Sequence, residues 1–199
     1  MKKLTSILIA LYLIAGCSSG GGVSGGAGGA GTFTTDSGLV LAASVSPDGD
    51  VSVDAFVSIC EVDADTGEVT FEEGITSSLG TFTITVLDAS DLTGGLFPRG
   101  ITLDRYTVSY SGPRPGTPTL STRTFSSTVS ILAGNGTTTT PVVLLDLDTI
   151  VREFQPQSSG SIVSYTVTVR FTGRDLNGEA LTLVASTFLE VGNFDRCTA

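Results

Sequence analysis

The sequence contains no histidine and no tryptophan, and its only two lysines are Lys2 and Lys3. Without histidine, the chain cannot build Ser-His-Asp or Cys-His catalytic groups, histidine-ligated zinc or a bis-histidine haem site. Both lysines lie in a segment that we expect to be removed, which excludes Schiff-base chemistry and a P-loop from the rest of the chain. The lack of tryptophan, with only four tyrosines, weakens a sugar-stacking role. Carboxylate, hydroxyl and arginine chemistry remain available.

Positive charge is scarce and unevenly placed. The 199 residues include 10 basic and 20 acidic side chains, for a formal net charge of −10. No basic residue occurs between Cys17 and Phe97, although that stretch holds 12 acidic residues. Nucleic acid is therefore not an expected partner, because binding to a phosphate backbone requires a basic patch. The acidic first half is the distinctive feature of the expected surface.

The first seventeen residues read as an export signal. Lys2 and Lys3 precede an apolar run at 4–14, which is shorter than the roughly 20 residues that a membrane-spanning helix needs. The sequence Ile14-Ala15-Gly16-Cys17 that follows resembles the lipobox of bacterial lipoproteins. This resemblance implies cleavage before Cys17 and acylation of that cysteine, with palmitate among the acyl chains. An ordinary signal peptide with a chance cysteine is the alternative.

A flexible tether is expected directly after the lipidated cysteine. Residues 18–31 are almost wholly Gly, Ser and Ala, a composition with almost nothing to bury. We therefore expect a signal peptide at 1–16, a tether at 17–31 and one folded domain at 32–199. Several acyl chains would anchor the protein stably to a membrane. Because Ser18 and not an aspartate follows Cys17, the resemblance implies the outer membrane, with the domain facing the periplasm or the cell surface.

The rest of the chain is expected to be all-β. Runs rich in Val, Ile, Thr, Phe and Tyr alternate with Gly, Pro, Asp and Asn clusters, and no segment shows a sustained helical period. This pattern predicts an immunoglobulin-like β-sandwich of eight or nine strands, with a jelly roll or a closed barrel as the alternative. The expected strands lie at 39–45, 51–59, 68–71, 81–86, 101–110, 125–132, 142–154, 161–172 and 181–191.

Two details of the strands are specific. The runs at 161–172 and 181–191 alternate apolar and polar residues and flank Asn177-Gly178, which predicts a hairpin. In the run at 101–110 the apolar residues change from odd to even positions near Asp104-Arg105. A β-bulge at that point would keep one face buried.

Acidic turns provide the candidates for a metal site. Asp63 and Asp65, in the sequence Asp63-Ala64-Asp65-Thr66-Gly67-Glu68, partly resemble a calcium-binding loop. The third ligand and the closing glutamate of such a loop are missing, so a plain hairpin turn is the alternative. Asp48, Asp50, Asp88 and Asp91 are weaker candidates that could join them only if their loops met in space. Apart from this possible calcium, we expect no cofactor.

Paired carboxylates could in principle perform acid and base catalysis. Glu72 with Glu73, and Asp146 with Asp148, are such pairs. They would need a cleft that separates their pKa values. We expect Asp146 and Asp148 on the solvated face of a strand, so a glycosidase is a remote alternative. No catalytic residue is assigned, and the protein is not expected to be an enzyme.

Two cysteines remain after lipidation. In an oxidising compartment Cys60 and Cys197 are expected to form a disulfide that pins the C-terminus to the sandwich. The alternative is a reactive thiol, which would need a cationic neighbour, and Arg196 is the only basic residue near either cysteine in sequence.

Segments of the body also resemble known sequences. The runs at 165–178 and 188–194 look like a recurring C-terminal hairpin of uncharacterised exported lipoproteins of Gram-negative bacteria, and 101–110 looks like their central strand. This resemblance implies a shared fold and brings no activity with it. The expected function is a non-enzymatic, lipid-anchored envelope protein with a structural or binding role and an envelope protein as partner. A calcium-dependent adhesion or ligand-binding domain is the alternative.

Overall fold

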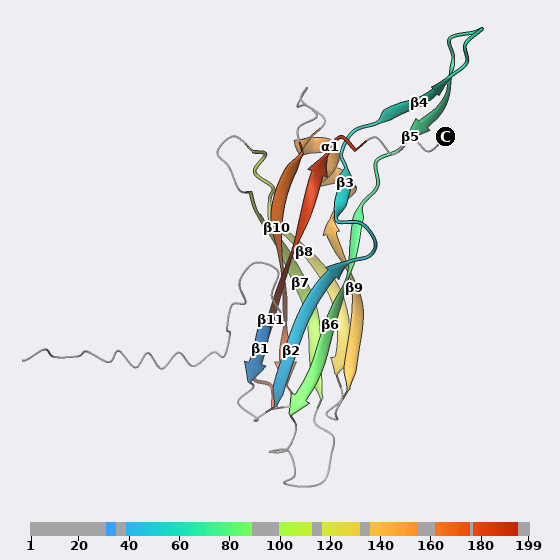
Figure 1. Cartoon of the computed structure of the whole chain (residues 1–199). Helices are drawn as coiled ribbons and strands as arrows, with labels where there is room; N and C mark the ends of the chain where they lie inside the picture. The colour runs from blue at the N-terminus through green and yellow to red at the C-terminus, as the bar shows by residue number, and fades with distance from the viewer. Residues whose placement is uncertain are drawn as a thin grey trace, which may run out of the picture.

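The structure is a computed structural model that describes residues 31–34, 39–88, 100–112, 117–131, 136–154, 162–175 and 177–194. The expected signal peptide, and the expected tether except for Gly31, lie outside these residues. Strands dominate the described part, and most of them run lengthwise in two stacked sheets (Figure 1). The described residues include one short helix, α1 (Leu147–Glu153), and none that is long and apolar enough to cross a membrane.

The first sheet has four strands in the order β1-β2-β6-β9, all antiparallel to their neighbours. Phe82, Ile84 and Val86 are buried on one face of β6, and the threonines between them are half-buried on the other. This alternation is the one predicted from the sequence. The strands are β1 (Gly31–Thr34), β2 (Val40–Pro47), β6 (Ser78–Asp88) and β9 (Thr137–Leu145).

The second sheet has five strands in the order β3-β11-β10-β7-β8, with β3 parallel to β11 and the other pairs antiparallel. The predicted β10–β11 hairpin is confirmed. In its turn, Gly178 has a φ of 83°, and Asp175 Oδ1 accepts hydrogen bonds from the backbone N–H groups of Asn177 and Glu179. The strands are β3 (Ser52–Asp54), β7 (Ile101–Ser111), β8 (Arg123–Ile131), β10 (Val163–Asp175) and β11 (Ala180–Gly192).

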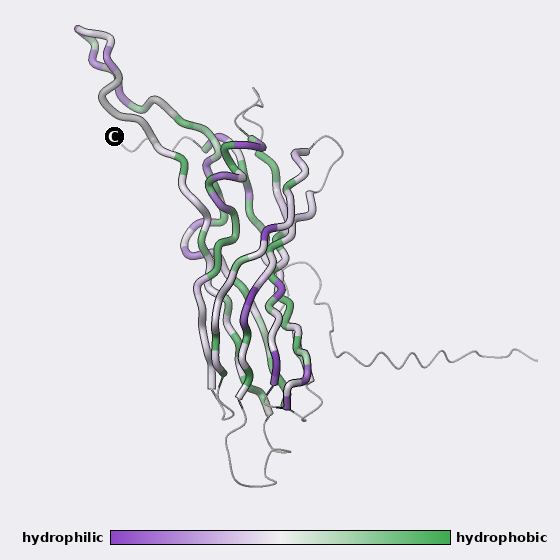
Figure 2. The backbone as a smooth tube through the Cα atoms, turned by 180° about the vertical axis from the view of Figure 1, so that it is seen from behind, coloured by the Kyte–Doolittle hydropathy of each residue, from purple (hydrophilic) through white to green (hydrophobic). Residues whose placement is uncertain are grey.

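The hydrophobic core lies between the two sheets. Phe82 of β6 packs on Phe171 of β10 with ring centroids 4.7 Å apart, and Tyr106 of β7 packs on Phe171 at 5.0 Å. Hydrophobic and hydrophilic residues alternate along the strands (Figure 2). Burial of this alternating face supplies most of the driving force for folding. The predicted all-β sandwich is confirmed, with nine strands in the two sheets of the described part.

The predicted β-bulge in β7 is also confirmed. Leu103 and Tyr106 are both buried while Asp104 and Arg105 are both exposed, so one extra residue restores the buried face. The register of β7 shifts at this point against both of its neighbours. In β10 opposite, a Cβ added at Gly173 would clash with the backbone carbonyl oxygen of Thr102, so only glycine fits.

The run at 51–59 does not form one strand. Its alternation predicts a single strand, but β3 ends at Asp54, and Val57 is 49% exposed. The reason is local, because Asp54 Oδ1 accepts a hydrogen bond from the backbone N–H of Phe56 and turns the chain out of the sheet. The chain continues as β4 (Ser58–Val62), whose only strand partner among the described residues is β5 (Val69–Glu73). We call residues 56–73 the β4–β5 arm, which projects from one end of the sandwich (Figure 1).

The prediction of a strand at 142–154 is wrong in its second half. β9 ends at Leu145, and Asp146 caps α1 by accepting hydrogen bonds from the backbone N–H and the hydroxyl of Thr149, at 3.0 and 2.8 Å. Ile150 and Phe154, one helical turn apart, are both buried. An aspartate in this position stabilises a helix N-terminus more than it suits a strand. Asp146 and Asp148 therefore do not share the face of a strand.

Candidate functional site

The segment between β2 and β3 carries the chain from one sheet to the other. The backbone N–H of Asp48 donates to the carbonyl of Leu79 at 3.0 Å, and the Thr81 hydroxyl donates to Asp48 Oδ1 at 2.7 Å. Gly49 then takes a φ of 105°, which favours glycine. On the other sheet, the backbone N–H of Glu190 donates to the carbonyl of Val51. The crossing segment is thus fixed to both sheets at the base of the β4–β5 arm.

Asp54 ends β3 in an unusual environment. The residue is only 8% exposed, and while its Oδ1 accepts the N–H of Phe56 at 3.0 Å, its Oδ2 is buried and has no hydrogen-bond partner. Buried polar atoms are nearly always paired, because losing water without gaining a partner is costly, and a charged group is the costliest case. Asp54 Oδ2 is the orphaned buried side-chain atom of the described residues.

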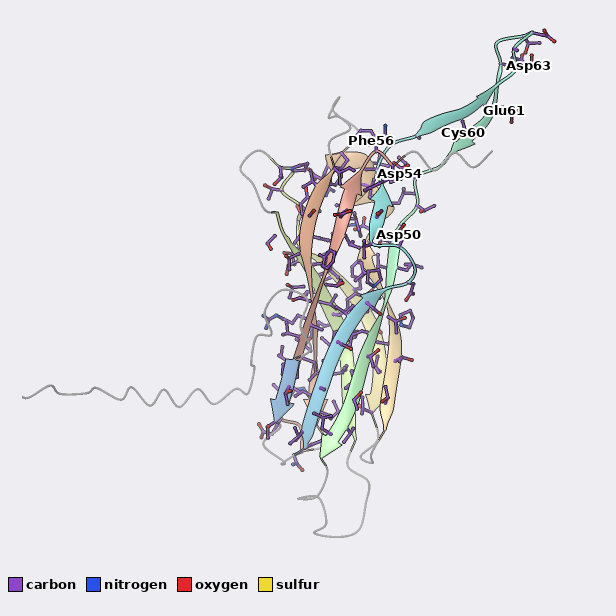
Figure 3. The ribbon with its side chains drawn as sticks, viewed as in Figure 1. Asp50, Asp54, Phe56, Cys60, Glu61 and Asp63 are labelled. Carbon is purple, nitrogen blue, oxygen red and sulfur yellow. The ribbon has the colours of Figure 1, made fainter. Side chains whose placement is uncertain are left out.

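A cavity of about 250 Å³ lies beside this carboxylate. The crossing segment forms one wall, and the return from the arm into β6, residues 74–79, forms the other. Its lining is rich in oxygen, with the carboxylates of Asp48, Asp50 and Asp54 and the hydroxyls of Ser52, Thr76, Ser77 and Ser78. Asp50 and Asp54 lie along one edge of the sandwich below the arm (Figure 3). Such a lining attracts cations and hydrogen-bond donors and repels anions.

The β4–β5 arm ends in a tight hairpin turn. Asp63 Oδ1 accepts the backbone N–H groups of Asp65 and Thr66, both at 2.8 Å, and these bonds lower the pKa of Asp63 below its ordinary value. Gly67, with a φ of 70°, donates its N–H to the carbonyl of Asp63. Asp63 therefore shapes the turn, as in the hairpin interpretation of this motif.

The structure does not bring the candidate metal ligands together. Asp63 lies at the far tip of the arm, whereas Asp50 lies at the sandwich (Figure 3). Within the described residues, no group of three or more His, Cys, Asp or Glu side chains is placed to hold a metal ion. Asp91 and the side chain of Asp88 lie outside what the structure describes. Asp54, by contrast, was not among the sequence candidates, because nothing in an alternating run marks one of its polar positions as buried.

The paired carboxylates are not arranged as a catalytic pair. Asp146 is the helix cap and forms an ion pair with Arg123, with Nε and Oδ2 3.2 Å apart. Asp148 is exposed in the first turn of α1. The backbone of Glu72 and Glu73 belongs to β5, but their side chains are not among those described.

The three cysteines lie in different parts of the chain. Cys60 is half-buried in the middle of β4, within the arm. It has a bonded partner and is not a free thiol. Cys17 and Cys197 both lie outside the described residues.

Comparison with known proteins yields little. No family model matches the sequence, and no curated protein matches it. Among solved structures, the solution structure of a protein described as late embryogenesis abundant (LEA) aligns with 75% of this chain and 70% of its own, at 12% identity and a TM-score of 0.36. A likeness this weak carries no argument about fold or function. None of these findings places the chain in a family.

Proposed function

We propose that the chain is an exported bacterial lipoprotein that serves the cell envelope as a non-enzymatic binding or structural module. The observation that carries the proposal is Ile14-Ala15-Gly16-Cys17, directly after a short apolar run. Acyl chains on Cys17 would anchor the protein to the outer membrane, and the Gly/Ser-rich residues before β1 would hold the sandwich away from the lipid surface.

The anchor can be tested by metabolic labelling with an alkyne analogue of palmitate. We expect the full-length protein to take up the label and to fractionate with membranes, and Cys17→Ala to lose the label. Ser18→Ala is the matched control and should keep the label. Ser18→Asp should move the labelled protein to the inner membrane if the lipoprotein sorting rule applies. An unlabelled wild-type protein would refute the anchor.

We further propose that Cys60 and Cys197 form a disulfide. Cys60 is already engaged with a partner, and the chain would be exported to an oxidising compartment. The bond would fasten the C-terminal segment to the β4–β5 arm. The arm needs such support, because a two-stranded hairpin is only marginally stable by itself in water.

A calcium-dependent adhesion or ligand-binding domain is the second candidate. Its support is the oxygen-rich lining of the cavity with Asp48, Asp50 and Asp54, because calcium prefers oxygen ligands, although these carboxylates do not converge as a metal-holding group in the described residues. A calcium ion that binds the folded state must raise the midpoint of thermal unfolding. Thermal unfolding of the full-length protein with excess calcium, and then with chelator, tests this candidate. An unchanged midpoint would remove it.

A further inference from the structure

We propose that the outer face of the first sheet is a dimer interface, on which a second copy of this chain packs face to face. This goes beyond the function proposed above, and it holds whether or not Cys17 carries lipid. The outer face consists of the residues that point away from the core, which are the even-numbered residues of 32–34 and 40–46 and the odd-numbered residues of 79–87 and 137–143. We call this set the β6 face, after its longest strand.

The β6 face carries no charged side chain. Every residue in it is Thr, Ser, Ala, Val, Leu or Pro, and Asp48, which accepts the Thr81 hydroxyl, lies just past the end of β2 at its rim. The outer face of the second sheet is the comparison within the same molecule, because it carries Arg105, Arg170 and Glu190. Depletion of charge distinguishes the centre of a protein–protein interface from the rest of a protein surface.

Two leucines of the β6 face are exposed. Leu79 and Leu87, near the two ends of β6, are 50% and 53% exposed, whereas the inward side chains Phe82 and Ile84 of the same strand are fully buried. An apolar side chain gains free energy when it leaves water. A partner that covers the β6 face would bury both leucines together with the methyl groups of the threonines between them.

The charge of the chain favours a second copy as that partner. Each copy has a formal net charge of −10, so two copies repel each other wherever their charged surfaces approach. The β6 face is a surface through which they can meet without placing like charges opposite each other. An external partner with a complementary charge would find no countercharge on this face.

The β6 face is also self-complementary about its centre. Leu79 and Leu87 each lie four residues from Thr83 along β6. A two-fold axis that runs across the strands at Thr83 would set Leu79 of one copy over Leu87 of the other, and Thr83 over Thr83. Such an isologous contact closes after two copies. Stacked sheets pack about 10 Å apart, a distance that side chains of this size can fill.

The size of the face is sufficient for a weak dimer. Four strands spaced by about 4.8 Å, with about eight residues of about 3.4 Å each, give about 500 Å² per copy. Two copies would therefore bury about 1,000 Å², which is the lower limit for a specific protein–protein interface. We therefore expect a reversible dimer whose population depends on concentration.

The test is sedimentation equilibrium of the full-length protein in a density-matched detergent, at about 1 to 100 μM protein. We expect a monomer–dimer equilibrium with a Kd on the order of 10 μM. Thr83→Arg sets two positive charges opposite each other at the axis and should weaken dimerisation at least about tenfold. Thr166→Arg is the matched control and should dimerise normally, because Thr166 is also a half-buried threonine of an interior strand but faces outward from the second sheet.

Two further variants test the geometry. A mixture of Thr83→Arg with Thr83→Glu should recover the dimer, because the axis sets an arginine of one copy against a glutamate of the other. Leu87→Gln should weaken the wild-type dimer about tenfold, since each dimer loses two buried leucines. It tests the same face if a Thr83 variant fails to fold, which circular dichroism would show.

Four results would overturn the proposal. They are a protein that stays monomeric over the whole range, equal dimerisation of wild type, Thr83→Arg and Leu87→Gln, an equal loss in Thr166→Arg, and a mixture of the two folded Thr83 variants that stays monomeric. A lipid surface is the other occupant to distinguish. If unacylated Cys17→Ala protein stayed monomeric and floated with phosphatidylglycerol vesicles, and Cys17→Ala/Thr83→Glu did not float, the face would belong to a membrane and the dimer would be wrong.

Discussion

The hydroxyl of Tyr110 in β7 donates a 2.8 Å hydrogen bond to the backbone carbonyl of Leu144 in β9. Four residues earlier in β7, the hydroxyl of Tyr106 accepts the backbone N–H of Val143 at 2.9 Å. β7 and β9 belong to opposite sheets, so two tyrosines of β7 pair with the backbone of two consecutive residues of β9 across the sandwich. β9 is an edge strand of its sheet, and these bonds give two of its backbone groups partners from the opposite sheet.

Tyr110→Phe should therefore destabilise the fold. It removes the donor to Leu144 and leaves that carbonyl without this partner, for a loss of about 1–2 kcal/mol in the free energy of unfolding. Urea unfolding of the full-length protein measures this loss. Thr139→Val, a change at an exposed position in the same edge strand, is the control and should have a smaller effect. Equal stability of Tyr110→Phe and wild type would show that the bond contributes nothing.

The buried tyrosines predict a loss of stability in alkali. Burial raises the pKa of Tyr110 above its ordinary value, and burial with the nearby charge of Glu153 raises that of Tyr165 to about 12. In the unfolded chain both ionise near pH 10, so the folded state holds more protons above that pH. Their contribution is complete below pH 10 and is lost as the pH rises toward 12. Unfolding free energies from about pH 9 to about pH 12 should fall less steeply in Tyr110→Phe/Tyr165→Phe.

Asp146→Ala should destabilise the protein by about 1–2 kcal/mol, because it removes the cap of α1 together with the ion pair to Arg123. Thermal or urea unfolding measures the change. Asp148→Ala is a close control two residues away, on an exposed side chain, and should stay within about 0.5 kcal/mol of wild type. If the two variants lost the same stability, the loss would come from the charge near the helix and not from the cap.

Asp54→Asn should stabilise the ligand-free protein. Replacing the buried carboxylate by an amide removes the charge of a side chain whose Oδ2 has no hydrogen-bond partner, and it keeps an oxygen acceptor for the Phe56 N–H. A gain of about 1 kcal/mol corresponds to a rise of about 2–4 °C in the unfolding midpoint. Asp50→Asn, on the exposed side of the cavity, should change the midpoint less. A lower midpoint in Asp54→Asn would mean that the carboxylate is stabilising as it stands.

The disulfide proposed between Cys60 and Cys197 predicts the result of thiol counting. Denatured full-length protein should show two more maleimide-reactive thiols after reduction than before it. Cys197→Ser should lower the free energy of unfolding by about 2–4 kcal/mol, since a cross-link between distant positions restricts the unfolded chain. If Cys60 reacted with maleimide before reduction, the disulfide would be excluded.

The parts of the fold that were predicted from the sequence depend on alternation over long stretches. The β10–β11 hairpin and the bulge at Asp104 were both visible, because a two-residue period and its interruption follow directly from which face is buried. The helix α1 was not predicted, because the apolar residues on both sides of Asp146 indicated one continuous strand at 142–154. Asp146 followed by Thr149, with Ile150 and Phe154 one turn apart, was the available signal.

The candidate site could be predicted only in part. Asp48 and Asp50 were noted as acidic turn residues, but their placement beside Asp54 depends on where the chain crosses between the sheets. The division of the run at 51–59 also had no signal, because the apolar residues alternate on both sides of Asp54. Asp54 is buried only because of the residues that surround it in the folded protein. The local sequence pattern therefore does not predict its environment.

The position of the β4–β5 arm also determines how much the sequence of the arm can change while the sandwich still folds. Among the described side chains of the arm, only Phe56 at its first position packs against the sandwich core, and the two points where the arm leaves and rejoins the sandwich line the same cavity. The arm is therefore an insertion whose two ends lie close together at the sandwich. Its length, charge and tip can be exchanged between variants, by mutation or by design, while the scaffold below folds as before.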